Sequence, residues 1–368
     1  MRINLKSQRS NFDVPLIAAT TTLVFFGLLI IYDATVVSAF RDFGDKYYYF
    51  KNQLIWASLG FMALGLFSFF DYHKLLKMAP LFVIVSFLLL LLVLIPHIGT
   101  KVYGARRWIT IAGFTFQPSE LAKIAIILYS TNIMSKFEKF KIILTDITLV
   151  LFLPILLMAL LVLSQPDLGT AAIFVGILLT IYFIGKGPVW HFLLLIPGLI
   201  VIGIISIFTH PYRASRITSF FNPSHDPQGV SYQINQILIA IASGGLFGVG
   251  LGGSRAKFAF IPEVQSDSIF AIFVEELGFA GALIFISLFI FLIKRAINIA
   301  RESLDFEGKI LAMGIIGLLS IQSLFNLASV VALVPLTGIP LPFISYGGSS
   351  LFVTMATIGI LINIKRQS

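Results

Sequence analysis

Residues 78–96 read MAPLFVIVSFLLLLLVLIP, a run with no charged side chain. About 20 apolar residues in a helix cross the ~30 Å hydrocarbon layer of a bilayer, so this run predicts a transmembrane helix. Similar uncharged runs recur at 14–32, 52–70, 147–166, 168–185, 187–209 and 310–364, and the last is long enough for two spans. With 58% hydrophobic residues and a mean hydropathy of +0.96, the chain is predicted to be an integral membrane protein.

We expect an all-α polytopic fold, in one domain over residues 1–368, with ten transmembrane helices. They are placed near residues 14–33, 52–70, 79–96, 118–135, 147–164, 167–185, 189–208, 269–293, 310–332 and 343–364. An even number of spans puts both ends of the chain on one side of the membrane. The loops on that side carry more of the Lys and Arg, which predicts that both termini are cytoplasmic.

The net charge of +9 does not indicate nucleic-acid binding, because the basic residues lie in the loops between apolar runs. We expect the lipid bilayer as a partner of the chain, and we expect no nucleic acid. The chain has no Cys, so disulfides and Cys-ligated metals are excluded.

One large outer loop is expected at about 209–268, between the seventh and eighth helices. Within it, residues 230–254 carry no charge and are long enough to span. The apolar side chains of Ile234, Ile237, Leu238 and Ile241 form a single stripe, which favours a short interfacial helix. The alternative is an eleventh span, which would put the carboxyl terminus outside, against Lys365 and Arg366.

Four of the expected helices begin on the outer side with Pro and polar neighbours. The stretches are QPSE (117–120), QPD (165–167), PE (262–263) ahead of Asp267, and PLP (340–342) ahead of Ser345. Pro suits the first turn of a helix, where its missing N–H costs nothing. Several helix amino termini facing outward would favour an anionic ligand such as a diphosphate.

Charged groups at membrane depth need a partner or a function. Glu120 and Lys123 lie three residues apart, on one helix face, and can pair. The pair either holds helices together or lines a polar cavity in which Lys123 balances an anion. Arg106 and Arg107 directly precede Trp108, and Arg beside Trp is typical of an interfacial anchor. Because neighbouring side chains diverge, one Arg can anchor while the other reaches a ligand.

A second basic group lies in the large outer loop. Arg213 and Arg216 share a face if their segment is helical, and Lys257 follows with Arg255. A phosphate ligand would explain cations on the side that the positive-inside rule disfavours. Asp167 is interpreted mainly as a helix cap.

Acidic residues surround the start of the eighth helix. Asp267 precedes it and follows Glu263, so the carboxylate is either a helix cap or a catalytic group. Glu275 and Glu276 are about 100° apart around the helix, and we expect one of them to face the bundle.

In these residues the chain resembles the SEDS family of polytopic peptidoglycan glycosyltransferases, whose branches FtsW and RodA serve division and elongation. The resemblance covers nearly the whole chain. Its motifs are GARRWI (104–109), QPSELAK (117–123), QPDLGT (165–170), NP (222–223), DSIFA (267–271), EELG (275–278) and LPFISYGGSS (341–350). The family usually has Phe after the key Asp, where this chain has Ser268. The stretch TGIPLP (337–342) is more similar to the FtsW branch.

The resemblance implies that the protein polymerises lipid II by an inverting displacement that releases undecaprenyl diphosphate, with Asp267 as the general base. The implied substrate-binding residues are Arg106, Arg107, Glu120, Lys123, Arg213, Arg216, Lys257, Glu263 and Ser345. A divalent cation, Mg²⁺ or Mn²⁺, between Asp267 and a substrate diphosphate is compatible with this chemistry. The sequence contains no dedicated cluster of metal ligands.

The resemblance also implies partners and a location: a class B penicillin-binding transpeptidase, other divisome proteins, and the bacterial cytoplasmic membrane at the division septum. Three alternatives stay open. The chain could be a lipid II flippase, an elongation-type RodA, or a scaffold without activity. Inverted repeats with polar groups at the membrane midplane would indicate a transporter, but the polar groups gather on the outer side and no such repeat is visible.

Overall fold

The computed structural model describes residues 12–102, 105–111, 114–140, 144–208, 211–222, 230–258 and 265–368. Each of the ten expected helices corresponds to a helix in it. These are α1 (Val14–Phe43), α2 (Tyr48–Phe69), α4 (Ala79–Leu92), α5 (Pro118–Phe140), α6 (Leu144–Ser164), α7 (Leu168–Ile184), α8 (Trp190–Phe208), α11 (Ile269–Glu302), α12 (Phe306–Val330) and α13 (Gly348–Gln367). The hydropathy pattern therefore located the helices correctly.

The described chain also contains elements that the hydropathy pattern did not predict. They are the helices α3 (Tyr72–Lys77) and α9 (Pro211–Phe221) and the strands β1 (Gly99–Val102), β2 (Ala105–Ile111) and β3 (Phe114–Phe116). Helix α10 (Val230–Gly244) is the short helix expected in the large outer loop. The strands form one antiparallel sheet in the order β1-β2-β3. The all-α expectation is thus wrong for the segment between α4 and α5, where β-branched and aromatic residues such as Trp108 and Ile109 favour strands.

Six of the described helices are long and apolar enough to cross a membrane: α1, α2, α8, α11, α12 and α13. Three shorter apolar helical segments, Ala79–Leu92, Leu149–Ser164 and Leu168–Ile184, lie among them. Together they make the chain a multi-pass membrane protein. The count of ten spans stays a prediction.

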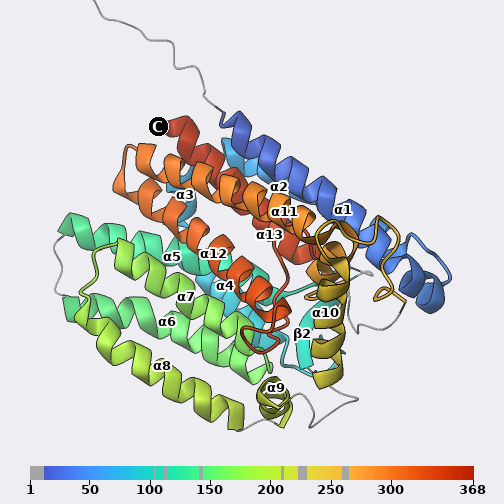
Figure 1. Cartoon of the computed structure of the whole chain (residues 1–368). Helices are drawn as coiled ribbons and strands as arrows, with labels where there is room; N and C mark the ends of the chain where they lie inside the picture. Colours follow the sequence, from blue (N-terminus) through green and yellow to red (C-terminus); the bar gives the residue numbers. More distant parts are fainter. Residues whose placement is uncertain are drawn as a thin grey trace, which may run out of the picture.

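The helices form one bundle, and α13 lies inside it (Figure 1). Nearly all side chains of α13 between Ser349 and Ile364 are buried, and α13 packs along α2. The guanidinium of Arg366 lies over the rings of Phe12 and Phe69, at 4.9 and 4.4 Å. The start of α1 and the carboxyl terminus therefore lie at the same end, as an even number of crossings requires, while α9, α10 and β2 lie toward the other end (Figure 1).

Helix α1 continues ten residues beyond its expected end at residue 33. It passes through Asp33, the first charged residue after the apolar run 14–32. It ends at Phe43 and is capped by Gly44, whose φ of 71° is the left-handed conformation that caps helices. Asp33 forms an ion pair with Lys257, with 3.0 Å between Nζ and Oδ1. This contact between distant segments explains why the helix tolerates the carboxylate.

Helix α10 agrees with the expected short helix in residues 230–254. Its 15 residues reach about 22 Å at 1.5 Å per residue, which is less than the ~30 Å layer. Ile234 and Ile237 of the predicted stripe are buried, whereas Leu238 is 39% exposed. The stripe therefore packs against the protein along only part of its predicted width.

Helix α11 is interrupted, which the sequence did not predict. Gly278 has φ 66° and ψ −167°, which are not helical values. At this break the carbonyls of Glu275 and Glu276 accept hydrogen bonds from the backbone N–H groups of Val249 and Gly250, both at 3.0 Å. The Gly-rich turn after α10 thus satisfies backbone groups that the break leaves without helical partners.

Candidate functional site

Asp267 lies in the loop just before α11, and only 5% of its surface is exposed. Its Oδ1 accepts hydrogen bonds from the hydroxyls of Ser266 and Ser268, both at 3.3 Å. Burial raises the pKa of the Asp267 carboxyl above its usual range, and the nearby positive charge of Arg216 only partly offsets this. The arrangement is that of a carboxylate able to take up a proton at a pH higher than an ordinary Asp can.

Helix α9 brings Arg216 close enough for its charge to act on the Asp267 carboxyl. The Arg216 Nη1 donates to the Leu336 carbonyl at 2.6 Å, and it lies next to Gly338. The sequence indicated that Arg213 and Arg216 would share a face if the segment were helical, and α9 is a helix. Arg216 is therefore held by the loop that follows α12, beside Asp267.

The loop between α12 and α13 forms the other wall of the site. Asn326 of α12 donates through Nδ2 both to the Asp267 carbonyl at 2.9 Å and to the Ile339 carbonyl at 2.8 Å. The Tyr346 N–H donates to the Gln265 carbonyl at 2.8 Å. Backbone contacts thus fix the position of Asp267 on both sides.

Ser345 contributes to the shape of this wall. Its hydroxyl accepts a hydrogen bond from the Leu341 N–H at 2.8 Å, and its carbonyl accepts one from Gln53 Nε2 at 3.4 Å. The side chain is 5% exposed. In this structure Ser345 is a residue that holds its loop together.

Arg107 and Arg213 lie near each other around the start of α7. Arg107 donates to the carbonyls of Gln165 and Pro166, and its Nη1 is 3.8 Å from Asp167 Oδ2. Arg213 donates to the carbonyl of Leu163 and to Ser206. Burial lowers the pKa of Arg213, with Arg107 adding repulsion and Asp167 opposing both. Two cations therefore lie close to one carboxylate.

Asp167 caps α7, as expected: its Oδ1 accepts from the Thr170 N–H at 3.0 Å. Arg106 lies next to Arg107 on β2, so the two side chains point to opposite faces of the strand. Arg106 is opposite Lys101 of β1.

Glu120 and Lys123 form the buried pair that their spacing indicated, with 2.7 Å between Nζ and Oε1. The Lys123 ammonium also donates to Gln322 Oε1 at 3.0 Å. Gln322 Nε2 in turn donates to the Pro340 carbonyl at 3.0 Å. Since Gln322 precedes Asn326 by about one turn of α12, the pair lies about one turn from the Asp267 loop.

The Lys257 side chain binds residues of α1 and α11. Its ammonium donates to Asp33 and to Glu276 Oε1, at 3.0 Å each, so two carboxylates already occupy it. Glu275 accepts from the Ser254 hydroxyl and from the Arg255 N–H at 3.1 Å. The sequence indicated that one of the two glutamates faces the bundle; both are 4% exposed and bind the 254–257 turn. Glu263 lies outside the described residues.

Sequence reasoning missed Asn326, Gln322, Tyr346 and Asp33 as members of these networks. The available signal was an amide within an apolar run, since polar groups in a membrane helix need partners. The described residues around Asp267 provide a single carboxylate, so a divalent cation there would need oxygen atoms from a substrate. Among the described residues, the one group of three side chains suited to a metal is His73, Asp305 and Glu307.

The fold and this site define a multi-pass helical membrane protein with a buried carboxylate and Arg groups toward one end of its bundle. A family model described as a cell cycle protein, FtsW/RodA/SpoVE, matches residues 14–368, and the chain belongs to that family. The resemblance seen in the sequence motifs is therefore confirmed.

The chain is 40% identical to Stage V sporulation protein E of Bacillus subtilis, over 99% of this chain and all of the relative. It is 38% identical to a probable peptidoglycan glycosyltransferase FtsW of Geobacter metallireducens, over 100% of this chain and 97% of the relative. Relatives with these names support a peptidoglycan glycosyltransferase role.

Two solved structures are similar in fold. A chain from a peptidoglycan synthase complex, described by its coordination of polymerization and crosslinking, has a TM-score of 0.79 at 26% identity, covering 96% of this chain and 98% of that one. The crystal structure of Rod shape determining protein RodA of Thermus thermophilus has a TM-score of 0.69 at 26% identity, covering 96% and 97%. The similar proteins thus carry the names FtsW, Stage V sporulation protein E and Rod shape determining protein RodA.

Proposed function

We propose that the protein polymerises lipid II into glycan strands at the outer face of the cytoplasmic membrane, with Asp267 as the general base. The observation that carries this proposal is a buried carboxylate with a raised pKa beside Arg216. In the proposed step, Asp267 accepts the proton of a sugar 4-hydroxyl as that oxygen attacks the anomeric carbon of the second sugar. One displacement inverts the anomeric centre, and the diphosphate leaves with the bond electrons.

The leaving diphosphate needs positive charge where its own charge develops. Arg216 is next to Asp267, and Arg213 lies three residues earlier on α9, next to Arg107. These three residues are proposed to bind the diphosphate, with Arg106 nearby on β2. Lys123 and Glu120 would balance charge about one turn of α12 away from the Asp267 loop. For Lys257 and Ser345 the contacts support a positioning role in place of direct binding, and Glu263 stays a proposed binding residue.

The topology belongs to the same proposal. Ten helices cross the membrane, both termini are cytoplasmic, and α9, α10 and the sheet lie on the outer side. The segment from about 209 to 268 is the large outer loop of a single domain. The start of α1 lies beside the carboxyl terminus, which supports an even number of spans.

Division is the proposed setting, because several relatives carry the name FtsW. A class B penicillin-binding transpeptidase and other divisome proteins are the proposed partners. The similarity to a chain of a peptidoglycan synthase complex supports the transpeptidase.

The test supplies purified protein and its transpeptidase partner with lipid II and sizes the glycan products. The wild-type protein should produce polymer, and Asp267→Asn should produce almost none. Asp42→Asn is the matched control, since this exposed carboxylate forms an ion pair with the neighbouring Arg41. Equal polymer from Asp267→Asn would refute the assignment of the base. No polymer from the wild type, together with lipid II crossing liposomes, would favour the flippase instead.

A further inference from the structure

A small cavity lies at the end of the bundle that holds the carboxyl terminus, far from Asp267. Its volume is about 110 Å³, and it is lined by His73, Ser135, Glu138, Asp305, Phe306 and Glu307. Glu307 precedes Asn326 of the Asp267 site by 19 positions along α12, which is about 29 Å of helix. The proposed glycosyl transfer therefore leaves this cavity without a function.

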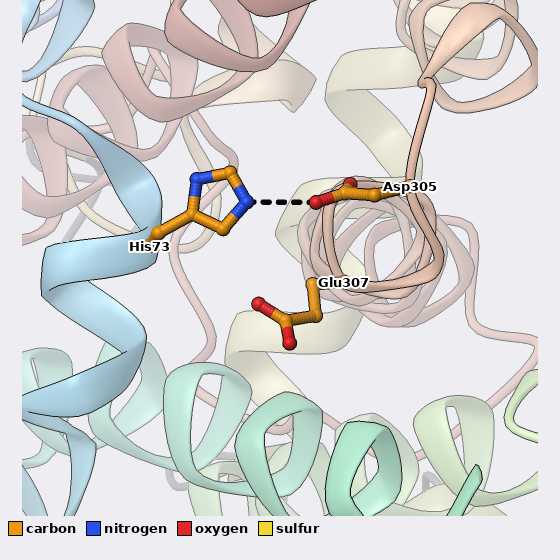
Figure 2. Close-up of side chains that lie close together, drawn as sticks. All are labelled: His73, Asp305 and Glu307. Atoms are coloured by element: carbon orange, nitrogen blue, oxygen red, sulfur yellow. Dashed lines mark hydrogen bonds and ion pairs between the residues drawn. The ribbon is translucent and has the colours of Figure 1, made fainter. Parts of the chain in front are cut away.

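Figure 2 shows His73 directed at Asp305, with the Glu307 carboxylate lying near this pair. His73 comes from α3, and Asp305 and Glu307 come from the start of α12. One ligand atom from each lies within 4.8 Å of the others. Ligands bonded at about 2.1 Å to one ion are at most about 4.2 Å apart. A small movement of the long Glu307 side chain would bring the three atoms into that range.

The two carboxylate oxygens of Asp305 have separate contacts. Oδ1 caps α12 by accepting from the Gly308 N–H at 2.8 Å, and it also accepts from the Tyr72 hydroxyl at 2.8 Å. Oδ2 is 2.8 Å from His73 Nε2. Oδ1 thus holds the carboxylate in place, and Oδ2 is left to bind within the cavity.

His73 is oriented from its other side. Its Nδ1 lies 2.9 Å from Asp71 Oδ1, so Nε2 is the nitrogen directed at Asp305 (Figure 2). A carboxylate that fixes one imidazole nitrogen while the other binds a metal is a recurring arrangement in metal sites. Asp71 lies outside the group of three ligands and supplies this support.

Carboxylates gather at this cavity. Glu138, Asp305 and Glu307 line it, and Asp71 lies behind His73. Lys186 Nζ is 3.9 Å from Glu138, and His73 adds a positive charge if it is protonated. A divalent ion bound here would interact favourably with these carboxylates.

We infer that His73, Asp305 and Glu307 bind a divalent first-row transition ion of the Zn²⁺ or Mn²⁺ type. One imidazole nitrogen and two carboxylates suit such ions better than Mg²⁺, which prefers oxygen ligands and keeps its water. The bound ion would take the place of the proton between His73 Nε2 and Asp305 Oδ2. It would join α3 to the start of α12, on the side of the molecule opposite the glycosyl-transfer site.

The test measures binding of Zn²⁺, Mn²⁺ and Mg²⁺ to chelator-treated full-length protein in detergent by calorimetry. One Zn²⁺ or Mn²⁺ should bind and raise the melting temperature, and Mg²⁺ should bind at least tenfold more weakly. Glu307→Gln and His73→Gln should each weaken binding at least tenfold. Glu302→Gln is the control, because Glu302 pairs with Lys365 at the same end of the bundle and does not line the cavity.

Electron spin resonance of bound Mn²⁺ gives a second measurement on the wild-type protein alone. Coupling to one imidazole nitrogen is expected. The inference is overturned if no saturable binding occurs, if both ligand variants bind as the control does, or if bound Mn²⁺ shows no nitrogen coupling. The wild-type spectrum decides the outcome even if a variant fails to fold.

Discussion

Replacing Asp267 with Asn should abolish glycosyl transfer and yet make the protein more stable at neutral pH. Asn has nearly the same shape and still accepts hydrogen bonds from Ser266 and Ser268 through Oδ1. It cannot take up the proton of the attacking hydroxyl. A positioned general base contributes about 10²- to 10⁴-fold, so the turnover rate should fall at least about 100-fold.

The gain in stability follows from the raised pKa of Asp267, whose ordinary value is 3.8. Because the folded pKa lies above the unfolded one, folding favours the protonated form. The loss of stability caused by the buried Asp267 charge is absent below pH 3.8, grows as the pH rises to the folded pKa, and is constant above it. At neutral pH, each pKa unit by which folding raises the Asp267 pKa lowers the free energy of unfolding by about 1.4 kcal/mol. Asn has no charge to bury, so the variant avoids this destabilisation.

Thermal unfolding of both proteins in detergent at pH 3.5 and pH 8 measures this effect, and glycan synthesis is measured alongside it at pH 8. The variant should exceed the wild type in melting temperature at pH 8, and by less at pH 3.5, which lies below the ordinary pKa of 3.8. Asp42→Asn should show neither change. A variant that is less stable than the wild type at pH 8 would mean that the Asp267 charge supports the fold, and the reasoning from burial would be wrong.

Three further outcomes are expected. Lys257→Met leaves Asp33 and Glu276 without their cation and should lower the free energy of unfolding by about 3 kcal/mol; unchanged chemical denaturation would contradict the ion-pair assignment. Gly248→Ala places a Cβ 2.0 Å from the Glu276 carbonyl oxygen, at a φ of +80° that Ala rarely adopts. It should lower the free energy of unfolding by more than about 1 kcal/mol in the same measurement. An unchanged free energy of unfolding would contradict the close approach of the two backbones. Arg216→Gln removes a charge that lowers the pKa of Asp267, so the acid limb of the rate-against-pH profile should move to higher pH, and a shift to lower pH would exclude this coupling.

The elements missed from the sequence are those whose stability depends on packing. Segments such as α3 and α9 are short and carry no uninterrupted apolar run, so hydropathy does not reveal them. The break at Gly278 depends on the turn around Gly248, thirty positions earlier, whose backbone groups bond across it. A Gly in an apolar run is compatible with a continuous helix or with a break, and only the contact decides between them.

The candidate site shows the same division. Glu120 and Lys123 could be paired from their spacing, because residues three apart share a helix face. The pairing of Lys257 with Asp33 could not be predicted from spacing, since Asp33 is 224 positions away on α1. The contact between Asn326 and the Asp267 backbone likewise joins residues 59 positions apart.

By itself the sequence determined that the chain is a multi-pass helical membrane protein of the SEDS family, and which residues carry the family motifs. Both follow from local properties, since the length and apolarity of a run decide whether it can cross lipid. The tertiary structure alone decided that Arg216 lies beside Asp267, that Lys257 is occupied by two carboxylates, and that His73 meets Asp305 and Glu307. The reason is that burial and charge pairing are properties of contacts between distant segments, and the same charged residue is a ligand, a cap or half of an ion pair depending on which segment packs against it.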